Sequence, residues 1–316
     1  MSLRVVFLGT PAFAVPSLEV LIRSPHQVVA VVSQPDRPRG RGQQLQPTPT
    51  KQTASAHGIP VLQPTKIRDE AFLQQIRDLR PDLGVVVAFG RILPDALLAI
   101  PRLGMINVHA SILPRYRGAA PIQRAVLAGD AETGVSIMRV VTELDAGPTF
   151  SIVKTPIPPD ATSGDMEGVL ARLGAAALLP VVDALAAGRA SETPQEDALA
   201  THAAKISKAE GAIDWSEPAP VVHNRVRGLQ PWPLASTELA GARLVIRRTQ
   251  PVALDTHAAT GGTIVRAYGD ELSVACGGGT ALRILELQPE GRRTMTAREF
   301  LAGHGGLEGA RLGARP

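Results

Sequence analysis

The sequence predicts an α/β protein with an open, mostly parallel sheet, followed by a small antiparallel β-barrel. In the first half, short apolar runs alternate with helical patterns, which is typical of a parallel sheet with crossover helices. The apolar runs are continuously hydrophobic, as expected of strands that are covered on both faces. In the last third, short β-rich segments are separated by glycine turns, and this pattern indicates a barrel.

The alternation of strands and helices starts at the N-terminus. Residues 3–9 (LRVVFLG) form an apolar run that ends in glycine, so the first strand is expected there. A helix is expected over 16–24, because Leu18, Leu21 and Ile22 recur at helical spacing. By the same criteria, further strands are expected at 27–34, 60–64, 83–90, 104–111 and 134–140, and further helices at 51–58, 68–79, 94–100 and 120–129.

The first half closes with an alanine-rich helix that is expected at about 170–188. Residues 190–205 follow and have the polar, aperiodic composition of an exposed connector. We therefore expect a first domain at 1–189, a linker at 190–205 and a second domain at 206–316. Strands of the second domain are expected at 242–252, 261–278 and 280–289.

The bulk composition limits the classes of function. With 316 residues, of which 44% are hydrophobic, the chain is long enough to bury a sizeable core. The net charge of +4 does not by itself indicate a nucleic-acid partner. Unbroken apolar runs such as 28–32 and 85–89 are far shorter than the roughly 20 residues of a membrane helix, so no membrane span is expected.

The compartment is inferred from the N-terminus and from cysteine usage. The stretch after Arg4 resembles a secretory signal, but Gly9 and Pro11 interrupt its apolar run, and we expect a strand and a turn instead. The single cysteine, Cys276, forbids an intrachain disulfide and is expected to be a buried, small apolar side chain. We expect a cytoplasmic monomer.

Two cofactor classes are not expected. The first turn, GTPAF, lacks the G-x-G-x-x-G spacing that brings a backbone against a pyrophosphate, so we expect no NAD site. No cluster of His, Cys, Asp or Glu has the spacing of a metal site, so no metal is expected either.

The stretch 106–118 (INVHASILPRYRG) holds the most distinctive polar groups. Asn107 and His109 share one face of the expected strand, because side chains alternate with period two. They lie near its carboxyl end, where parallel sheets bind their ligands. Asp145, in the connection ELDAG, is available to orient the imidazole and to favour its protonated form.

Such a trio suits acyl transfer. An amide and a charged imidazole can both donate to a developing oxyanion, and each well-placed donor contributes roughly 3 to 4 kcal/mol. Ser111 lacks the G-x-S-x-G elbow, so a nucleophile supplied by a substrate, for instance an amine, is favoured. Taken alone, an N-x-H pair is more often local hydrogen bonding at a strand end.

The longer stretch 106–125 resembles the signature of the folate-dependent formyltransferase family. It carries N-x-H, then S-x-L-P, then R-G-x-x-P-I. Further segments that resemble the family run through most of the chain: FLGTPAFAVPSLEVL, SQPDRPRGRGQQLQPTPTK, VVVAFGRILP, PRLGMINVH, GDAETGVSIM, AKISKAEGAIDW and GLQPWP. The last two of these, together with the basic loop at 34–51, point to the branch of the family that acts on methionyl-tRNA.

The resemblance implies transfer of a formyl group from 10-formyltetrahydrofolate to the α-amine of methionine on initiator tRNA. It also implies a Rossmann-like first domain and an OB-like barrel, both of which touch tRNA. The residues that match the catalytic trio of the family are Asn107, His109 and Asp145. The residues that match its folate-binding turn and pterin pocket are Ser111, Ile112, Leu113, Pro114, Phe89, Gly90 and Ile92.

The basic loop is expected to contact the acceptor end of the tRNA. Arg41 stands where the family has its key arginine, and Arg37, Arg39 and Lys51 accompany it. Two departures from the family concern these regions. Lysines often follow the G-R-G of the loop, but here Gln43 and Gln44 stand there, which implies weaker and less salt-dependent tRNA binding. The acidic motif L-D-T-G-D reads L-D-A-G-P in this chain, at 144–148.

Other interpretations remain open at this level. A formyltransferase for a nucleotide-linked amino sugar, an RNA-binding module without catalysis and a hydrolase that uses water are the alternatives to the tRNA enzyme. An arginine-rich loop taken alone is often only a solvated face. For Trp215 and Trp232, core packing is favoured over stacking on a base.

Overall fold

The computed structural model describes residues 1–39 and 44–313. It divides the chain into two compact units that are interleaved in sequence. Unit 1 comprises Met1–Pro121, Glu132–Pro156 and Glu167–Ala203, and unit 2 comprises Ile122–Ala131, Ile157–Met166 and Ala204–Pro316. Arg41 and Gln43, which the sequence singles out, lie outside the described residues.

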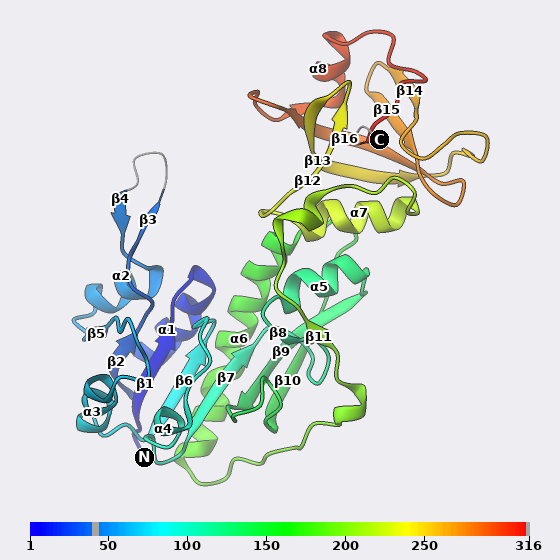
Figure 1. The fold of residues 1–316 in the computed structure, drawn as a ribbon. Coiled ribbons are helices and arrows are strands. Elements are labelled where there is room, and N and C mark those ends of the chain that lie inside the picture. Colours follow the sequence, from blue (N-terminus) through cyan, green and yellow to red (C-terminus); the bar gives the residue numbers. More distant parts are fainter. Residues whose placement is uncertain (40–43, 314–316) are drawn as a thin grey trace. The chain divides into compact units, whose positions relative to one another are not determined.

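Unit 1 is built on a seven-stranded sheet (Figure 1), with the order β10-β9-β7-β6-β1-β2-β5 among the described residues. The strands β5, β2, β1, β6 and β7 run parallel, and β9 and β10 are antiparallel additions at one end. The bounds are β1 Arg4–Gly9, β2 Gln27–Val32, β5 Val61–Leu62, β6 Leu83–Val87, β7 Met105–His109, β9 Glu132–Arg139 and β10 Thr149–Pro156. The expected mostly parallel α/β sheet is confirmed.

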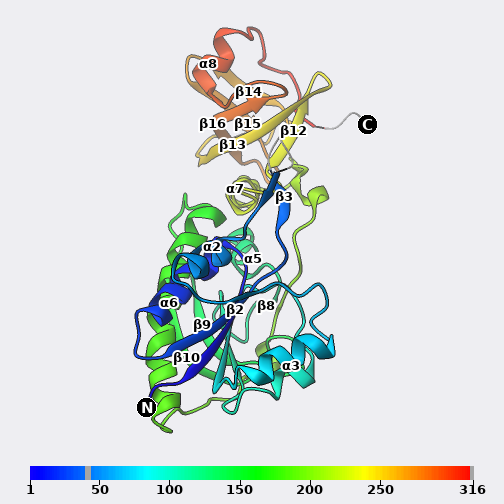
Figure 2. The same cartoon turned by 90° about the vertical axis from the view of Figure 1, so that its left-hand side faces the viewer.

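Helices cover both faces of this sheet (Figure 2). On one face, Val6 and Leu8 of β1 pack in a cluster with Phe72 and Ile76 of α3. On the other face, α6 approaches β7 so closely that a Cβ atom at Gly174 would lie 2.6 Å from Cγ1 of Val108. The bounds are α1 Val15–Ile22, α2 Pro49–Ala56, α3 Glu70–Asp78, α4 Asp95–Leu98 and α6 Ser163–Ala186, with a 3-10 turn η1 at Ala12–Ala14.

Helix α6 is longer than expected and begins at Ser163 instead of near residue 170. By length and composition it is long and apolar enough to cross a membrane, although it contains no long unbroken apolar run. Leu170, Leu178 and Val182 are fully buried within the protein, however. Burial of these residues and the contact of Gly174 with β7 are the features of a core helix.

Two segments of unit 1 differ from the expectation. Residues 149–156 were not expected to form a strand, yet they form β10, the edge of the sheet. Residues 190–203 are mostly exposed, in line with the expected connector, and differ from it in being tied to unit 1 by backbone pairing. Thr193 pairs with Thr149, and β11 (His202–Ala203) runs parallel to β8 (Arg117–Gly118). Their contacts with Arg117 and Asp145 make them part of the site described below.

Unit 2 contains a small antiparallel barrel, as expected. Its strands follow the order β12-β13-β16-β15-β14, with β17 paired to β16. Residues 311 and 312 bridge the two edges of this sheet, because Leu312 pairs with Leu239, the last residue of β12, and Arg311 pairs with Thr263 just before β14. The bounds are β12 Ala235–Leu239, β13 Ala242–Val252, β14 Ile264–Tyr268, β15 Glu271–Ala275, β16 Ala281–Pro289, β17 Met295–Thr296 and α8 Ala297–Ala302.

The core of unit 2 contains Trp215 and Cys276. Trp215 is buried and donates its indole N–H to Oγ1 of Thr237 at 3.0 Å, so it packs in the core, as expected. Trp232 is instead 55% exposed. Cys276 is buried in the same cluster as Trp215, and burial raises the pKa of its thiol to about 12. It therefore behaves as an apolar side chain.

Unit 2 also includes segments from the first half of the chain. Helix α5 (Pro121–Ala128) packs on α7 (Ala219–Gly228), where a Cβ at Gly228 would lie 2.8 Å from Cγ of Leu127. Arg124 forms an ion pair with Glu210 in the 3-10 turn η3 (Lys208–Gly211), with Nη1 2.6 Å from Oε2. Ser163 donates its hydroxyl to the carbonyl of Gly228 at 2.7 Å.

Candidate active site

Asn107 and His109 project from the face of β7 that is turned away from α6. Val108 between them contacts α6, and alternation along the strand directs its two neighbours to the opposite face. In the parallel register, Asn107 lies beside Val86, which belongs to the cluster on that same face. Strand β7 therefore presents an amide and an imidazole side by side.

His109 is buried, and both of its ring nitrogens face oxygen acceptors. Nε2 lies 2.9 Å from the backbone oxygen of Tyr116. Nδ1 lies 3.6 Å from Oδ2 of Asp145, which is longer than an ordinary hydrogen bond. A neutral imidazole has only one N–H, so the ring can donate to both acceptors only in its protonated form.

Asp145 is held by backbone groups. It lies in the turn between β9 and β10, with a left-handed φ of +50°, which few residues other than glycine adopt. Its Oδ2 accepts a hydrogen bond from the N–H of Gly118 at 2.9 Å. The structure thus brings Asp145 to His109, although the two residues are 36 positions apart in the sequence.

The short segment 116–118 positions both members of this pair. The carbonyl of Tyr116 accepts from His109, and the N–H of Gly118 donates to Asp145. Gly118 has a φ of +126°, and a Cβ there would lie 2.8 Å from the carbonyl oxygen of Ala203, so only glycine fits this position. The basic turn is therefore part of the support of the site.

Asn107 differs from His109 in having no internal partner. Its side chain is half-buried, and among residues 1–39 and 44–313 no group forms a hydrogen bond with its amide. An amide that is partly shielded from water and has no partner is available to a ligand. It is the clearest hydrogen-bond donor that this cluster offers to a substrate.

The turn that follows β7 is held together by two serines. Ser111 is fully buried and donates its hydroxyl to the carbonyl of Arg115 at 2.6 Å. The hydroxyl of Ser136 donates to the carbonyl of Ser111 and accepts from the N–H of Leu113. Ser111 and Leu113 thus shape the turn from inside, while Ile112 and Pro114 are the half-buried members of the predicted folate-binding set.

The predicted pterin-pocket residues lie in a turn after β6. Phe89 is buried in the core, and its carbonyl accepts a hydrogen bond from Nε2 of Gln34 at 3.1 Å. Gly90 has a φ of +79°, while Ile92 is 74% exposed. Of these three residues, Ile92 is the one whose side chain is accessible to a ligand.

The basic loop starts from a polar network. Lys51 places Nζ 2.6 Å from Oδ2 of Asp36 and 2.8 Å from Oε1 of Gln63. The hydrogen bond from Lys51, followed by that from Gln63, lowers the pKa of the Asp36 carboxyl. Arg37 is exposed on β3 (Arg37–Arg39), which pairs with β4 (Gln44–Gln46). The predicted tRNA contacts of Arg37, Arg39, Arg41 and Lys51 remain predictions.

Gln195 is the residue near the cluster that sequence reasoning missed. Its Nε2 donates to the carbonyls of Asp145 and Gly147, at 2.8 and 2.7 Å. Its Oε1 accepts from Nε and Nη2 of Arg117, at 3.1 and 2.9 Å. Gln195 lies in the segment that was taken for a connector, so no periodicity or motif marked it.

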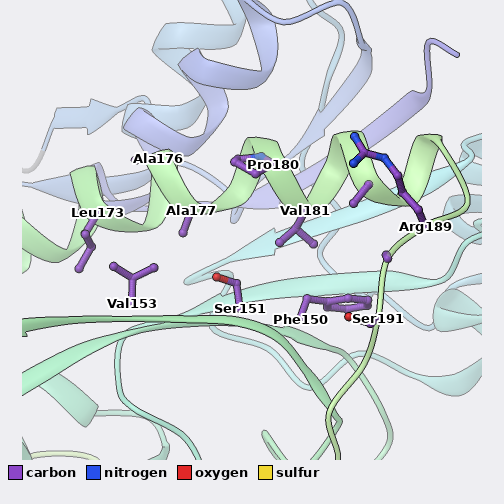
Figure 3. A pocket seen from close by; sticks show the side chains of 12 residues that line it. Phe150, Ser151, Val153, Leu173, Ala176, Ala177, Pro180, Val181, Arg189 and Ser191 are labelled. Carbon is purple, nitrogen blue, oxygen red and sulfur yellow. The ribbon is translucent and has the colours of Figure 1, made fainter.

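A separate cavity of about 500 Å³ lies between α6 and the outer strand β10 (Figure 3). Apolar side chains form most of its wall, with Arg189 and two serines beside them. None of the predicted site residues lines it. The lining residues are Phe150, Ser151, Val153, Leu173, Ala176, Ala177, Pro180, Val181, Ala184, Arg189, Ala190 and Ser191. In the described part of the chain, no group of three or more His, Cys, Asp or Glu side chains could hold a metal ion.

Comparison with known proteins assigns the family. A model described as "Formyl transferase" matches residues 3–182, more than half of the chain, and one described as "Formyl transferase, C-terminal domain" matches residues 205–305. The chain belongs to the formyl transferase family. The first match includes Asn107, His109 and Asp145, whereas Gln195 lies between the two matches.

Formyl transferase relatives with curated names share nearly half of their residues with this chain. A methionyl-tRNA formyltransferase of Moorella thermoacetica is 46% identical over 314 residues, which are 98% of this chain and 99% of the relative. One of Methylococcus capsulatus is 48% identical over 311 residues, which are 98% of this chain and 100% of the relative.

Solved structures share the fold at much lower identity. The N-formyltransferase of Helicobacter canadensis, solved with folinic acid and dTDP-3-aminofucose, matches with a TM-score of 0.68 at 15% identity over 91% of this chain and 99% of that one. HypX of Aquifex aeolicus, solved with tetrahydrofolic acid, matches 98% of this chain and 49% of its own with a TM-score of 0.65 and 15% identity.

Proposed function

We propose that this chain transfers the formyl group of 10-formyltetrahydrofolate to the α-amino group of methionine on initiator tRNA. The observation that carries the proposal is the cluster of Asn107, His109 and Asp145 at one end of a mostly parallel sheet, where no group of the described residues forms a hydrogen bond with the Asn107 amide. Relatives named methionyl-tRNA formyltransferase support this choice of substrate, since they align over nearly the whole chain.

The Asn107 amide suits the formyl oxygen. That oxygen gains negative charge when an amine attacks the formyl carbon, and a fixed donor at this position lowers the barrier. The backbone that carries the amide is fixed, because Asn107 lies on a central strand with paired neighbours on both sides, β6 and β9. Pre-orientation of this kind removes the cost of reorganising a donor during the reaction.

His109 and Asp145 handle the proton in this proposal. Nε2 of the ring lies 2.9 Å from the carbonyl oxygen of Tyr116, whereas Nδ1 lies beyond ordinary hydrogen-bond distance from Asp145, so we assign proton exchange with the reacting groups to Nδ1. Oδ2 of Asp145 lies 3.6 Å from this nitrogen. The attacking amine must lose a proton and the departing nitrogen must gain one, and the pair is placed to assist both.

The nucleophile comes from the substrate. Ser111 is buried with its hydroxyl bonded to Arg115, and Cys276 is buried in the barrel of unit 2 with its thiol pKa raised. Neither can attack a formyl carbon. An amine nucleophile requires no covalent enzyme intermediate, so a set of donors without a nucleophilic side chain is sufficient.

The basic loop provides the contact with tRNA in this proposal. Arg37, Arg39 and Arg41 can each neutralise a phosphate and release a counterion. Tetrahydrofolate and charged tRNA are both cytoplasmic, so we place the protein in the cytoplasm, as a monomer without a membrane partner.

The proposal is tested by supplying 10-formyltetrahydrofolate together with one acceptor at a time. The acceptors are methionyl initiator tRNA, a nucleotide-linked amino sugar and buffer alone, and the formylated product is measured by mass spectrometry. Formylmethionyl-tRNA as the main product supports the proposal. Formylated sugar would assign the chain to another branch of the family, and formate from buffer alone would indicate a hydrolase.

A further inference from the structure

We infer that Gln195 is a positioning residue that sets the distance between Asp145 and His109. The inference rests on the proposed function and adds a residue of the connector 190–203 to the support of the site. Four hydrogen bonds of one side chain, two donated and two accepted, carry it.

The Asp145 turn needs an external support. Asp145 adopts a left-handed φ of +50°, a conformation that persists only when the surroundings hold it. Within the turn, the N–H of Ala146 reaches the carbonyl of Glu143 only at 3.4 Å. The two N–H groups of the Gln195 amide fill this need, because they bind the carbonyls on both sides of Ala146.

The other end of the Gln195 amide holds the second loop of the site. Its Oε1 accepts two hydrogen bonds from the guanidinium of Arg117. Arg117 is the middle residue of the segment 116–118, whose Tyr116 carbonyl binds His109 and whose Gly118 N–H binds Asp145. One amide group therefore connects the loop that carries Asp145 to the segment that orients both His109 and Asp145.

The backbone around Gln195 is itself anchored on both sides. Thr193 and Thr149 exchange two backbone hydrogen bonds of 2.9 Å, and β11 pairs with β8 further along. The Gln195 side chain is half-buried between these anchors. Its position is therefore fixed by the sheet edge and not by the turn that it supports.

A small change in the distance between Asp145 and His109 has a large effect on their interaction. Nδ1 of His109 and Oδ2 of Asp145 are 3.6 Å apart, beyond the range of an ordinary hydrogen bond. A small movement of the turn decides whether the carboxylate reaches the imidazole. Misplacement of a reacting group by about 1 Å can lower a rate by about 100-fold.

Two variants separate the contacts of Gln195. Gln195→Met keeps the length of the side chain and removes all four hydrogen bonds. Gln195→Glu keeps an acceptor for Arg117 and removes both donors to the turn. Glu196→Gln is the matched control, because Glu196 is the exposed neighbour and its side chain forms no hydrogen bond within the described residues.

The first readout is formyl transfer, measured well below the unfolding midpoint of each variant. We expect kcat to fall about 10- to 100-fold in Gln195→Met and in Gln195→Glu, with KM for both substrates changed by less than about twofold. Wild-type kinetics in Gln195→Glu would show that the donors to the turn do not matter, and would overturn the inference.

The second readout does not depend on activity. Amide hydrogen exchange followed by NMR should be faster at Gly118 in both variants, because its acceptor on Asp145 is no longer held. Exchange at Ala119, whose N–H binds the carbonyl of Ala203 at 2.9 Å, should not change. Unchanged exchange at Gly118 would overturn the inference. A wild-type protein without formyl transfer would instead refute the proposed function and leave this readout intact.

Discussion

Asn107 and His109 stand two residues apart on one strand but differ in what they touch. His109 is buried, with Tyr116 and Asp145 at its two nitrogens, whereas the Asn107 amide has no partner among the described residues. A side chain without an internal partner contributes little to the folded state. Substitution of Asn107 should therefore affect catalysis and leave stability almost unchanged.

Asn107→Ala should lower kcat about 100- to 1000-fold, because it removes one donor from the developing oxyanion. KM for the folate and for the tRNA should change little, since the lost interaction belongs to the transition state. Steady-state formyl transfer with methionyl-tRNA measures this, and thermal unfolding is the control. A variant that lost binding and kept kcat would assign Asn107 to substrate binding only.

The residues of the site differ in how far the sequence predicts them. Asn107 and His109 follow from the period of two along a strand, which is a local rule. Asp145 is predicted to lie beside them from its motif. In the structure, its Oδ2 lies 3.6 Å from Nδ1 of His109. Neither a local rule nor a motif predicts a role for Gln195. It contributes because β10 and β11 bring the connector back over the sheet edge, which is a tertiary effect.

Among the elements, the hairpin β3–β4 shows that an ion pair can make a basic residue unavailable to a ligand. Lys51 reads in the sequence as a phosphate-binding cation, as do Arg37, Arg39 and Arg41. In the structure its ammonium group is bound to Asp36 and Gln63 at the base of the hairpin. Arg37 is exposed on β3. The two residues should therefore respond differently to salt.

Arg37→Ala should reduce the slope of log KM for tRNA against log salt by about 0.7 to 0.9, the value for one lost phosphate contact. Lys51→Met should leave that slope unchanged. Any change in KM itself would come from a shift of the hairpin, because Lys51 binds Asp36 and Gln63 at its base. The measurement is KM for methionyl-tRNA over a series of potassium chloride concentrations. Equal changes of slope in both variants would show that Lys51 leaves Asp36 to bind a phosphate.

Helix α7 carries a buried histidine that couples stability to pH. His223 binds Oγ1 of Thr249 through Nδ1 at 3.0 Å and the carbonyl of Pro159 through Nε2 at 3.1 Å. Burial lowers its pKa, assisted by the charge of Arg227, and the carbonyl of Pro159 and Asp160 oppose the shift. The folded state therefore binds this proton less readily than the unfolded state does.

A lowered histidine pKa makes stability rise with pH. The stabilisation from His223 should be complete above the unfolded pKa of about 6.5 and should be lost as pH falls toward the folded value. Tm should thus be lower at about pH 5.5 than at about pH 7.5, either side of that unfolded pKa. In His223→Gln, which keeps an N–H for Pro159, the difference in Tm between these two pH values should shrink. An undiminished difference would assign the pH dependence to other groups.

Element types were predicted better than element ends. The buried strands β1, β2, β6 and β7 were expected because parallel strands read as continuous apolar runs. The edge strand β10 was missed, since its residues are mostly half-buried or exposed and give no such run. Helix α6 was shortened in the prediction because its first turns (SGDMEGV) contain glycine and acidic residues.

The two units of the molecule interleave in sequence, which the expected boundaries at 189 and 206 do not reflect. Ile122–Ala131 and Ile157–Met166 belong to unit 2, although each of them lies between two segments of unit 1 in the sequence. Their contacts with later residues are specific. Arg124 pairs with Glu210, and Ser163 bonds to the carbonyl of Gly228. A chain that ended after residue 205 would retain these segments and lose their partners.

A truncation to residues 1–205 should therefore be destabilised, and not merely weakened in tRNA binding. Leu127 of α5, which lies against Gly228 of α7, and Arg124, which pairs with Glu210, would both lose their partners. Apolar surface that becomes exposed in this way binds the dye ANS, and the lost contacts should lower the Tm of the truncated protein. The comparison is between full-length and truncated proteins, by ANS fluorescence, thermal unfolding and titration with tetrahydrofolate. A truncated protein with the Tm and folate affinity of the full chain would show that residues 1–205 form an independent domain, as the sequence alone suggests.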